Sequence, residues 1–391
     1  MLREVSLQRL ERAVAPHLRR GWTRAVFAAP QGEDGARAEQ VVAGPGSGVA
    51  PTPEQLAALF TAAREAARSG LFKQTYVLDE RRRVQVDARH GRPALRTLDE
   101  AAARKVMGGK DRTLRPDTSD ALLRAIGIMN ADGSISATHA RKYKQVNHLA
   151  ALCRPTLERL TAARPRSAAD PLRVLDLACG NAYLSFVLAE VLRQDGVPLR
   201  LHGVDVRDDV VARSRERAAT LEMADRLSFA RATIAEAESD AAVALGGPPD
   251  LVLALHACDT ATDEALALAI RLGAPAVLSV PCCQHELAAQ LAARDPATAP
   301  VPAILEHGLL RGAYADLLTD ALRVEILGAC GYDVAVVEFV SSEHTAKNLL
   351  LRCHRRHPYA PVDRARWRLA PVRARCDQLG VSPDLLRRLE A

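Results

Sequence analysis

The segment 173–186, Arg-Val-Leu-Asp-Leu-Ala-Cys-Gly-Asn-Ala-Tyr-Leu-Ser-Phe, constrains the fold of this chain more than any other. A short apolar run, Val174–Leu177, is followed by the small residues Ala178, Cys179 and Gly180, and then by apolar residues at helical spacing. A buried strand, a tight turn and a helix in this order form the first unit of a doubly wound α/β domain. Such a turn lets the backbone approach a ligand closely, and the helix start offers N–H groups without a partner inside the helix.

Strands and helices alternate regularly beyond residue 170. We expect strands at 174–177, 199–206, 227–234, 251–256 and 276–280, and helices at 181–193, 208–221 and 262–272. A helical and loop stretch then precedes two strands, 332–340 and 348–353, that form an antiparallel pair. This spacing is typical of a parallel sheet covered by helices on both faces. The predicted fold is α/β: a Rossmann-like doubly wound sheet with a terminal antiparallel strand pair.

The chain has 391 residues, which is too long for one small domain, so we expect three parts. Residues 1–130 are predicted to form a smaller α+β N-terminal domain, with a helix that Thr52 caps and Pro53 begins. Residues 131–358 hold the doubly wound sheet, and residues 359–391 form a basic helical tail. Near the first junction, Asp117 or Thr118 is expected to cap a helix at 120–128. Pro155 is expected to break or kink the helix that begins at His139.

The composition favours a cytoplasmic protein. Its eight cysteines do not fall at the spacings of a disulfide framework, and the first fourteen residues carry several charges. No uncharged run approaches the roughly 18 residues that a membrane span needs. We therefore expect free thiols, a reducing compartment and no membrane partner. The net charge of +6 is compatible with an anionic partner.

Two acids distinguish the turn from a dinucleotide site. The full G-x-G-x-x-G pattern is missing, and Asp176 stands at the end of the first strand, where it disfavours a pyrophosphate and favours a cationic amino-acid tail. Asp205, at the end of the second strand, is placed to accept hydrogen bonds from ribose hydroxyls. A nicotinamide enzyme and a non-catalytic Rossmann-like protein are the alternatives.

With these residues the chain resembles the class I S-adenosylmethionine-dependent methyltransferases over about residues 135–355. The first motif of that family is acid-x-Gly-x-Gly-x-Gly, and here Ala178 and Ala182 stand where glycine is usual. The resemblance implies that the turn lines the methionine part of S-adenosylmethionine, that Asp205 holds its ribose, and that the end of the third strand flanks the adenine. The residues implied to contact the cofactor are Asp176, Ala178, Cys179, Gly180, Asn181, Leu184, Asp205, Thr233, Ile234 and His256.

Thiol and imidazole groups follow the fourth and fifth strands. The fourth strand leads into His-Ala-Cys-Asp, 256–259, and the fifth into Cys-Cys-Gln-His, 282–285. Because the carboxyl ends of neighbouring parallel strands face the ligand crevice, we expect these turns to converge near the transferable methyl group. The candidate catalytic residues are His256, Cys258, Asp259, Cys282, Cys283 and His285.

Three roles are open for this group. A cysteine could be a nucleophile, as in the RNA cytosine-5 methyltransferases, although the Asp-x-Pro-Cys and Thr-Cys turns of those enzymes are absent. The thiols and His285 could bind zinc, but adjacent cysteines chelate a tetrahedral ion poorly, and we predict no metal. In the third role, His256 and Asp259 orient a nitrogen or oxygen acceptor, which needs mainly proximity and a proton sink. The motifs His-x-Cys-Asp and Val-Pro-Cys-Cys, with the segment 342–348, are similar to those of a subgroup of methyltransferase-like proteins.

RNA, ribosomal or transfer, is the expected methyl acceptor. A basic loop at 105–115, a cationic helix at 139–153 and an arginine-rich tail supply positive charge for phosphates. Residues 351–391 hold ten arginines against four acids. The candidates for base stacking are Tyr143, Tyr183, Tyr314 and Trp367. A protein or small-molecule methyltransferase and a non-catalytic binding protein are the alternatives.

Overall fold

The computed structural model describes residues 4–29, 38–79, 82–89, 94–97, 107, 112–255, 257–281, 284–294, 301–339 and 349–391. The chain divides into two compact units, Met1–Asn147 and His148–Ala391. The first unit extends beyond residue 130 because Tyr143 and Asn147 are bonded to Leu114. The Tyr143 hydroxyl donates to the Leu114 carbonyl (2.7 Å), and the Leu114 N–H donates to the Asn147 side chain (2.8 Å).

The first unit is built on a five-stranded antiparallel sheet in the order β2-β1-β3-β4-β5. Helix α2 begins at Pro53 with Thr52 as its cap, as predicted, and Thr52 and Gln55 also satisfy each other's backbone N–H groups in a capping box. Ser119 precedes α4, where the sequence analysis expected Asp117 or Thr118 to cap the helix. The elements are α1 (Glu4–Val14), η1 (Ala15–Leu18), β1 (Arg24–Ala28), β2 (Glu39–Ala43), α2 (Pro53–Arg68), β3 (Lys73–Val77), β4 (Arg82–Asp87), β5 (Ala94–Thr97) and α4 (Asp120–Ala125).

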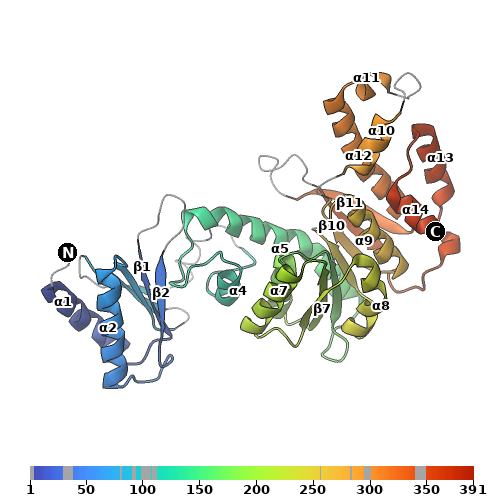
Figure 1. The fold of residues 1–391 in the computed structure, drawn as a ribbon. Coiled ribbons are helices and arrows are strands. Elements are labelled where there is room, and N and C mark those ends of the chain that lie inside the picture. Colours follow the sequence, from blue (N-terminus) through green and yellow to red (C-terminus); the bar gives the residue numbers. More distant parts are fainter. Residues whose placement is uncertain are drawn as a thin grey trace. The chain divides into compact units, whose positions relative to one another are not determined.

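The second unit contains the predicted doubly wound sheet, with seven strands in the order β11-β12-β10-β9-β6-β7-β8. Strands β6 to β10 are parallel, and β12 runs antiparallel to both β10 and β11, which confirms the terminal antiparallel pair. Helices α7 and α8 lie on opposite sides of the sheet (Figure 1). The strands are β6 (Leu172–Leu177), β7 (Leu199–Asp205), β8 (Leu227–Arg231), β9 (Leu251–Ala254), β10 (Ala276–Ser279), β11 (Tyr332–Glu338) and β12 (Leu349–Arg355).

Helices fill the connections between these strands, and the buried faces of the helices from residue 234 onward form one apolar core with the sheet. They are α5 (Ala137–Ala163), α6 (Tyr183–Gln194), α7 (Asp208–Thr220), α8 (Ile234–Leu245), α9 (Thr260–Arg271), α10 (Glu286–Ala292), α11 (Pro302–Leu305), α12 (Gly308–Ala329), η3 (Arg364–Arg366), α13 (Leu369–Leu379) and α14 (Asp384–Glu390). Val372, Leu385 and Leu389 of the tail are buried in this core. The tail is therefore part of the second unit rather than a separate appendage.

Two local expectations were wrong. Helix α5 continues through Pro155. The ring lacks the N–H that would bond to the Ala151 carbonyl, and the next carbonyl, that of Leu152, accepts a hydrogen bond from Arg352 Nη2 (2.7 Å). Strand β8 ends at Arg231, because Thr233 begins α8 with a capping box to Glu236.

Candidate functional site

The sheet of the second unit reverses its direction of growth between β6 and β9. The chain passes from β6 to β7 and β8 on one side, and then returns to β9 and β10 on the other. In open α/β sheets, ligands bind outside the carboxyl ends of the strands at such a switch point. The turn 178–182 leaves β6 at this point, and Ala178, Gly180 and Ala182 all have positive φ, at 52°, 55° and 52°. The backbone here adopts the conformation that glycine prefers, although two of the three residues are alanines.

Asp176 lies one residue before the end of β6 and is only 3% exposed. Its Oδ2 accepts a hydrogen bond from the Ser185 hydroxyl in the first turn of α6. The pKa of Asp176 is raised to about 7, mainly by burial and also by the neighbouring Asp205, while the Ser185 hydrogen bond opposes both. The site therefore contains a carboxyl group that a nearby positive charge would ionise.

Asp205, the last residue of β7, is 5% exposed and ties the turn to the neighbouring strand. Its Oδ2 accepts from the Gly180 N–H (2.8 Å), and its Oδ1 accepts from the N–H (3.0 Å) and the Nε (3.2 Å) of Arg207. A carboxylate offers about four acceptor positions, so Asp205 retains capacity for a hydroxyl group.

The other residues of the turn take part through their backbone or pack in the core. The Cys179 thiol is 1% exposed, and Gly203 lies so near that a side chain there would meet it at 3.2 Å. Burial raises the Cys179 pKa far above its usual value, so this thiol is not a nucleophile. Leu184 is buried, and the Asn181 carbonyl accepts from Arg217 Nη1 (2.8 Å).

Thr233 and Ile234 follow β8 at the same edge of the sheet. They were expected to end the strand, but they begin helix α8. The Thr233 N–H and hydroxyl donate to Glu236 Oε2, at 2.8 and 2.9 Å, and the Glu236 N–H returns a bond to the hydroxyl. Ile234 is 8% exposed and belongs to the core. The polar atoms of Thr233 are thus occupied by its own helix start.

The charge at this edge of the sheet fits S-adenosylmethionine. Two nearly buried carboxyl groups, Asp176 and Asp205, lie close enough to raise the pKa of Asp176, and among the described residues Arg207 is the one cation paired with either. The Arg207 side chain is 59% exposed, so water weakens its effect. A ligand with a sulfonium and an ammonium group supplies the missing positive charge, and its ribose suits Asp205.

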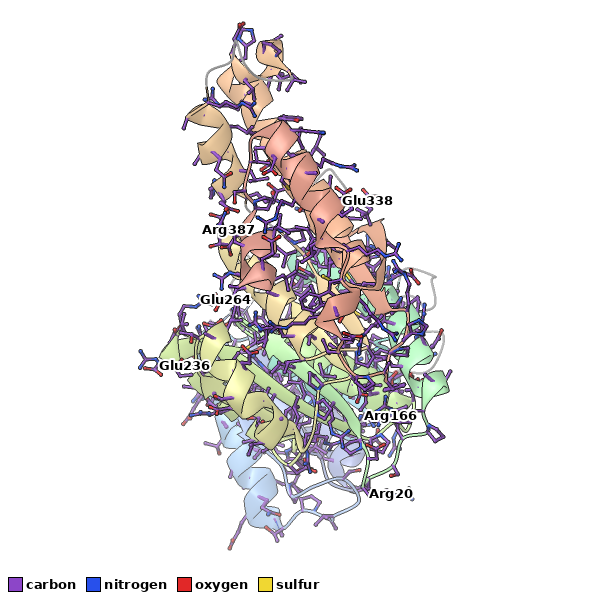
Figure 2. All side chains as sticks on the ribbon, turned by 90° about the vertical axis from the view of Figure 1, so that its right-hand side faces the viewer. Arg20, Arg166, Glu236, Glu264, Glu338 and Arg387 are labelled. Atoms are coloured by element: carbon purple, nitrogen blue, oxygen red, sulfur yellow. The ribbon has the colours of Figure 1, made fainter. Side chains whose placement is uncertain are left out.

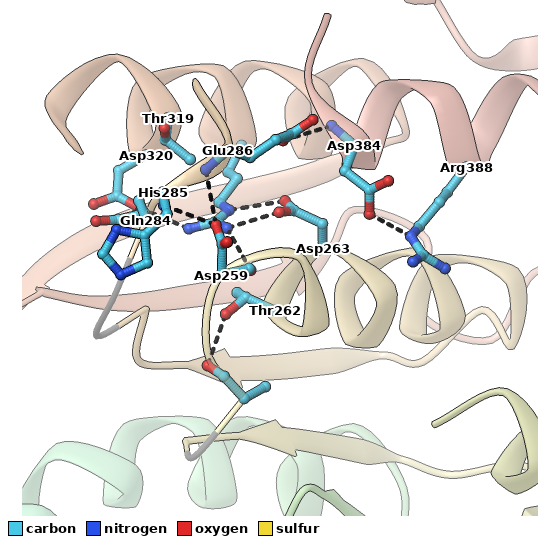
Figure 3. Close-up of polar contacts among 12 residues, drawn as sticks. Asp259, Thr262, Asp263, Gln284, His285, Glu286, Thr319, Asp320, Asp384 and Arg388 are labelled. Carbon is cyan, nitrogen blue, oxygen red and sulfur yellow. Dashed lines mark hydrogen bonds and ion pairs between the residues drawn. The ribbon is translucent and has the colours of Figure 1, made fainter. Parts of the chain in front are cut away.

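The turns after β9 and β10 meet, as Figure 3 shows. Asp259 Oδ1 accepts from the backbone N–H groups of His285 (2.8 Å) and Glu286 (3.1 Å), at the start of α10. Asp259 has φ 53° and ψ −127°, an unfavourable backbone conformation for a residue with a side chain. Orienting the acceptor is one of the roles that the sequence leaves open for Asp259. Its Oδ1 joins the two turns, and the His285 side chain is exposed.

A buried polar network that the sequence analysis missed supports this junction (Figure 3). Arg323 of α12 forms an ion pair with Asp263, with the side chains 2% and 4% exposed, and also bonds to Asp320 (3.2 Å) and to the Asp259 carbonyl (3.1 Å). Gln284 donates to Asp320 (2.7 Å). Arg323 lies in an apolar helical pattern 60 residues from Asp263, so the sequence holds no local signal for the pair.

Three candidate catalytic residues, His256, Cys282 and Cys283, lie outside the described residues. Cys258 is exposed and forms no disulfide. Among the residues that the structure describes, no group of three metal-binding side chains is found. No helix in the described ranges is both long enough and apolar enough to span a membrane.

Residues 141–290 match the family described as a methyltransferase domain. No curated protein matches the sequence. Similar solved structures include an S-adenosylhomocysteine-bound methyltransferase from Podospora anserina (15% identity, 66% of this chain and 97% of that chain, TM-score 0.35) and cofactor-bound Rv0187 from MTB (18%, 66% and 95%, TM-score 0.35). A third is the fibrillarin pre-rRNA processing protein of Methanococcus jannaschii (10%, 47% and 66%, TM-score 0.32).

The matched segment begins within α5 and ends within α10, so it includes β6, the turn, Asp205 and the junction at Asp259. Residues 141–290 therefore carry a methyltransferase domain, and the cofactor of this domain is S-adenosylmethionine.

Proposed function

We propose that this methyltransferase transfers the methyl group of S-adenosylmethionine to RNA. The cofactor supplies the methyl group when bound. On this proposal the turn 178–182 and Asp176 hold its methionine part, Asp205 holds its ribose, and the acceptor atom enters between the turns that Asp259 joins. The observation that carries the choice of RNA is a groove with a strong excess of positive charge at the amino ends of the strands.

This arginine groove has a volume of about 720 Å³. It is lined by residues 328–331 at the end of α12 and, from the end of β12 onward, by residues 355–357, 360–361, 363 and 366–368. β12 ends where β9 and β10 begin, so the groove lies at the edge opposite the cofactor turn. With strands of four to seven residues, the two edges are roughly 13–23 Å apart. A polymer can reach both edges at once, whereas a small metabolite cannot.

Two of the four arginines that line the groove, Arg355 and Arg368, have no acidic partner among the described residues. Arg356 pairs with Asp333. The Arg355 guanidinium donates to the carbonyls of Gly273, Ala360 and Pro361, which leave its charge unneutralised. Arg366 pairs with Asp363, but its side chain is 82% exposed. Solvated guanidinium groups of this kind suit the phosphates of a nucleic acid.

The remaining arginines of the tail are paired with acids. Arg373 pairs with Glu390, Arg375 with Glu325, and Arg387, on α14 (Figure 2), with Glu286. We therefore propose that only the first part of the tail, up to Arg368, contacts RNA. In the helix 139–153, Arg141 and Lys144 are exposed, and most of the loop 105–115 lies outside the described residues.

One aromatic ring that lines the groove, and one that lines a neighbouring pocket, each lie under an arginine. The Arg364 guanidinium lies over the Trp367 ring at 5.6 Å, and that of Arg164 lies over the Tyr359 ring at 5.3 Å. Tyr359 is 45% exposed, which gives a base a surface on which to stack. The sequence analysis named Trp367 but not Tyr359, and it also named Tyr143, which is buried.

The salt dependence of RNA binding tests this proposal. In titrations of a fluorescein-labelled oligouridylate, the double variant Arg364→Ala/Arg368→Ala, which removes two exposed arginines without an ion pair among the described residues, should bind more weakly than the wild type. Its slope of log K against log salt should be smaller by about 1.4, since each lost phosphate contact removes ~0.7 for a single strand. Arg373→Ala/Arg375→Ala removes the same charge at paired positions and should keep the wild-type slope.

Mass-spectrometric analysis of nucleosides from a deletion strain identifies the product. A methylated nucleoside that is missing from the RNA of the strain, and that purified enzyme restores, supports RNA as substrate. An unchanged nucleoside profile, together with oligouridylate binding that neither double variant alters, contradicts it. Tight S-adenosylmethionine binding with that result would favour a protein or small-molecule acceptor.

A further inference from the structure

The first unit contains a pocket of about 280 Å³ that none of the preceding functions uses. It lies between the start of β1, the hairpin of β3 and β4, and helix α4. Four arginines line it, together with the carboxylates of Asp79, Asp120 and Asp132 and with Thr23, Val77, Pro116, Ala121, Met129 and Gly133. We propose that this pocket binds a phosphate group through the guanidinium groups of Arg24 and Arg83.

Two of the four arginines are paired with carboxylates at the rim of the pocket. Arg82 donates through Nε to Asp79 Oδ2 (2.7 Å), and Arg124 pairs with Asp120 (2.5 Å). The Arg82 side chain is 51% exposed, whereas those of Arg124 and Asp120 are 26% and 30% exposed. Within each pair the positive and negative charges offset each other. The net positive charge of the pocket therefore comes from the other two arginines, Arg24 and Arg83.

Arg24 and Arg83 have no ion pair among the described residues. Arg24 Nε donates to the Ala131 carbonyl (2.9 Å), and Arg83 Nη1 donates to the Asp132 carbonyl (2.6 Å). Neither guanidinium has a buried nitrogen without a partner, so their remaining N–H groups face accessible space. The Asp132 carboxylate attracts both cations, but its Oδ1 is engaged by the N–H and hydroxyl of Ser134.

The two cations repel each other and are partly removed from water. Burial lowers the pKa of Arg24, and Arg124 and Arg83 lower it further, while Asp120 and Asp132 oppose them. Burial also lowers the pKa of Arg83. An anion placed between the guanidinium groups would relieve the repulsion and satisfy their free N–H groups.

The loop 130–134 fixes both side chains in advance. It supplies the two carbonyls that hold Arg24 and Arg83, and Asp132 closes it by bonding to Ser134. Gly133 has φ 76°, and a side chain there would meet Arg83 Nη1 at 2.4 Å. The glycine therefore allows the close approach that holds the Arg83 fork in place. A site held in this way loses little conformational entropy when an anion binds.

A phosphate suits this pocket better than a carboxylate or a metal ion. Arginine binds phosphate with forked, charge-assisted hydrogen bonds, and the tetrahedral oxygens of a phosphate can meet two guanidinium groups from different strands. A cation is disfavoured because four arginines face three carboxylates. The volume admits a phosphate with a small attached group, so the source is either a free phosphorylated molecule or the phosphorylated end of a nucleic acid.

Ala121 offers a test that leaves the arginines unchanged. It is exposed on α4 and lines the pocket, so Ala121→Glu places a carboxylate there without removing a contact. Calorimetric titration of the full chain with inorganic phosphate should show saturable binding in the wild type. Binding should fall at least tenfold in Ala121→Glu and persist in the neutral control Ala121→Gln. Arg24→Gln should abolish it, whereas Arg82→Gln, at a paired position, should weaken it less than threefold.

A 5′-phosphorylated oligouridylate and its dephosphorylated twin separate the two sources. Tighter binding of the phosphorylated oligonucleotide, lost in Ala121→Glu, assigns the site to nucleic-acid ends. Equal binding of both, with phosphate binding retained, assigns it to a free phosphorylated molecule. No heat with phosphate in the wild type, or equal binding by Ala121→Glu and Ala121→Gln, overturns the site whether or not the chain methylates RNA.

Discussion

Replacing Asp176 by asparagine should remove a defined part of the pH dependence of stability. Asp176 is 3% exposed, and burial raises its pKa from an ordinary 3.8 to about 7. The folded state thus binds a proton more tightly than the unfolded state, so the contribution of Asp176 is fully present below pH 4 and is lost as pH rises towards 7. A rise of this size corresponds to ~4 kcal/mol.

Urea unfolding of the wild type and Asp176→Asn between pH 4 and pH 8 measures the contribution of Asp176 to the free energy of unfolding. The amide keeps an acceptor for the Ser185 hydroxyl but cannot ionise. The variant should gain up to ~4 kcal/mol of stability relative to the wild type as pH rises through this range, because other titrating groups cancel in the difference. Parallel pH profiles for the two proteins would refute the assignment of a raised pKa to Asp176. In the wild type, S-adenosylmethionine should also bind more tightly at pH 8 than at pH 6, since a cationic ligand favours the ionised carboxylate.

Three further changes probe the surroundings of the site. Arg323→Met leaves Asp263 buried without its partner and should lower the free energy of unfolding in urea by about 3–5 kcal/mol. Arg323→Met/Asp263→Leu should recover at least half of this loss. A double variant as unstable as the single one would contradict the reasoning. Ala178→Gly should raise the free energy of unfolding by about 0.5–1 kcal/mol, because φ is 52° at this position, and a fall in the melting temperature would count against it. Thr233→Ala should cost about 1 kcal/mol through the lost helix cap and leave S-adenosylmethionine affinity unchanged by calorimetry; weaker binding would restore a cofactor role for Thr233.

Local signals predicted the elements that form the cofactor edge. The apolar run and small-residue turn located β6 and α6 within two residues, and the acid at the end of β7 was placed correctly. The start of α2 was also predicted, because Thr52 and Pro53 form a helix start that depends only on neighbouring residues. A helix-start signal of the same kind, Thr-x-x-Glu at 233–236, begins α8, where the apolar pattern predicts the end of a strand.

Interactions between distant residues account for what the sequence did not reveal. The tail reads as a uniformly cationic surface, yet Arg387 pairs with Glu286, 101 residues away, and Arg375 with Glu325. Pro155 is typical of a helix end, but α5 continues through it, and Arg352 of β12 donates to the Leu152 carbonyl beside it. No periodicity or motif encodes such pairings, because each depends on the completed sheet.

The junction at Asp259 shows how this distinction changes the interpretation of the site. An acid at a strand end beside histidine and cysteine is typical of a catalytic group, and the sequence alone favours that role. In the structure the backbone of Asp259 is strained, and three bonds hold it: two from the start of α10 to its carboxylate and one from Arg323 to its carbonyl. These contacts fix the turn that carries Cys258 against the turn that leads to α10. We therefore infer that Asp259 is a positioning residue, whose loss would alter the geometry of the acceptor site before it altered any proton transfer. Asp259→Asn, which keeps an acceptor oxygen at the same position, should retain most activity, whereas Asp259→Ala should lose it together with stability; equal activity loss in both variants would instead support a direct role in proton transfer.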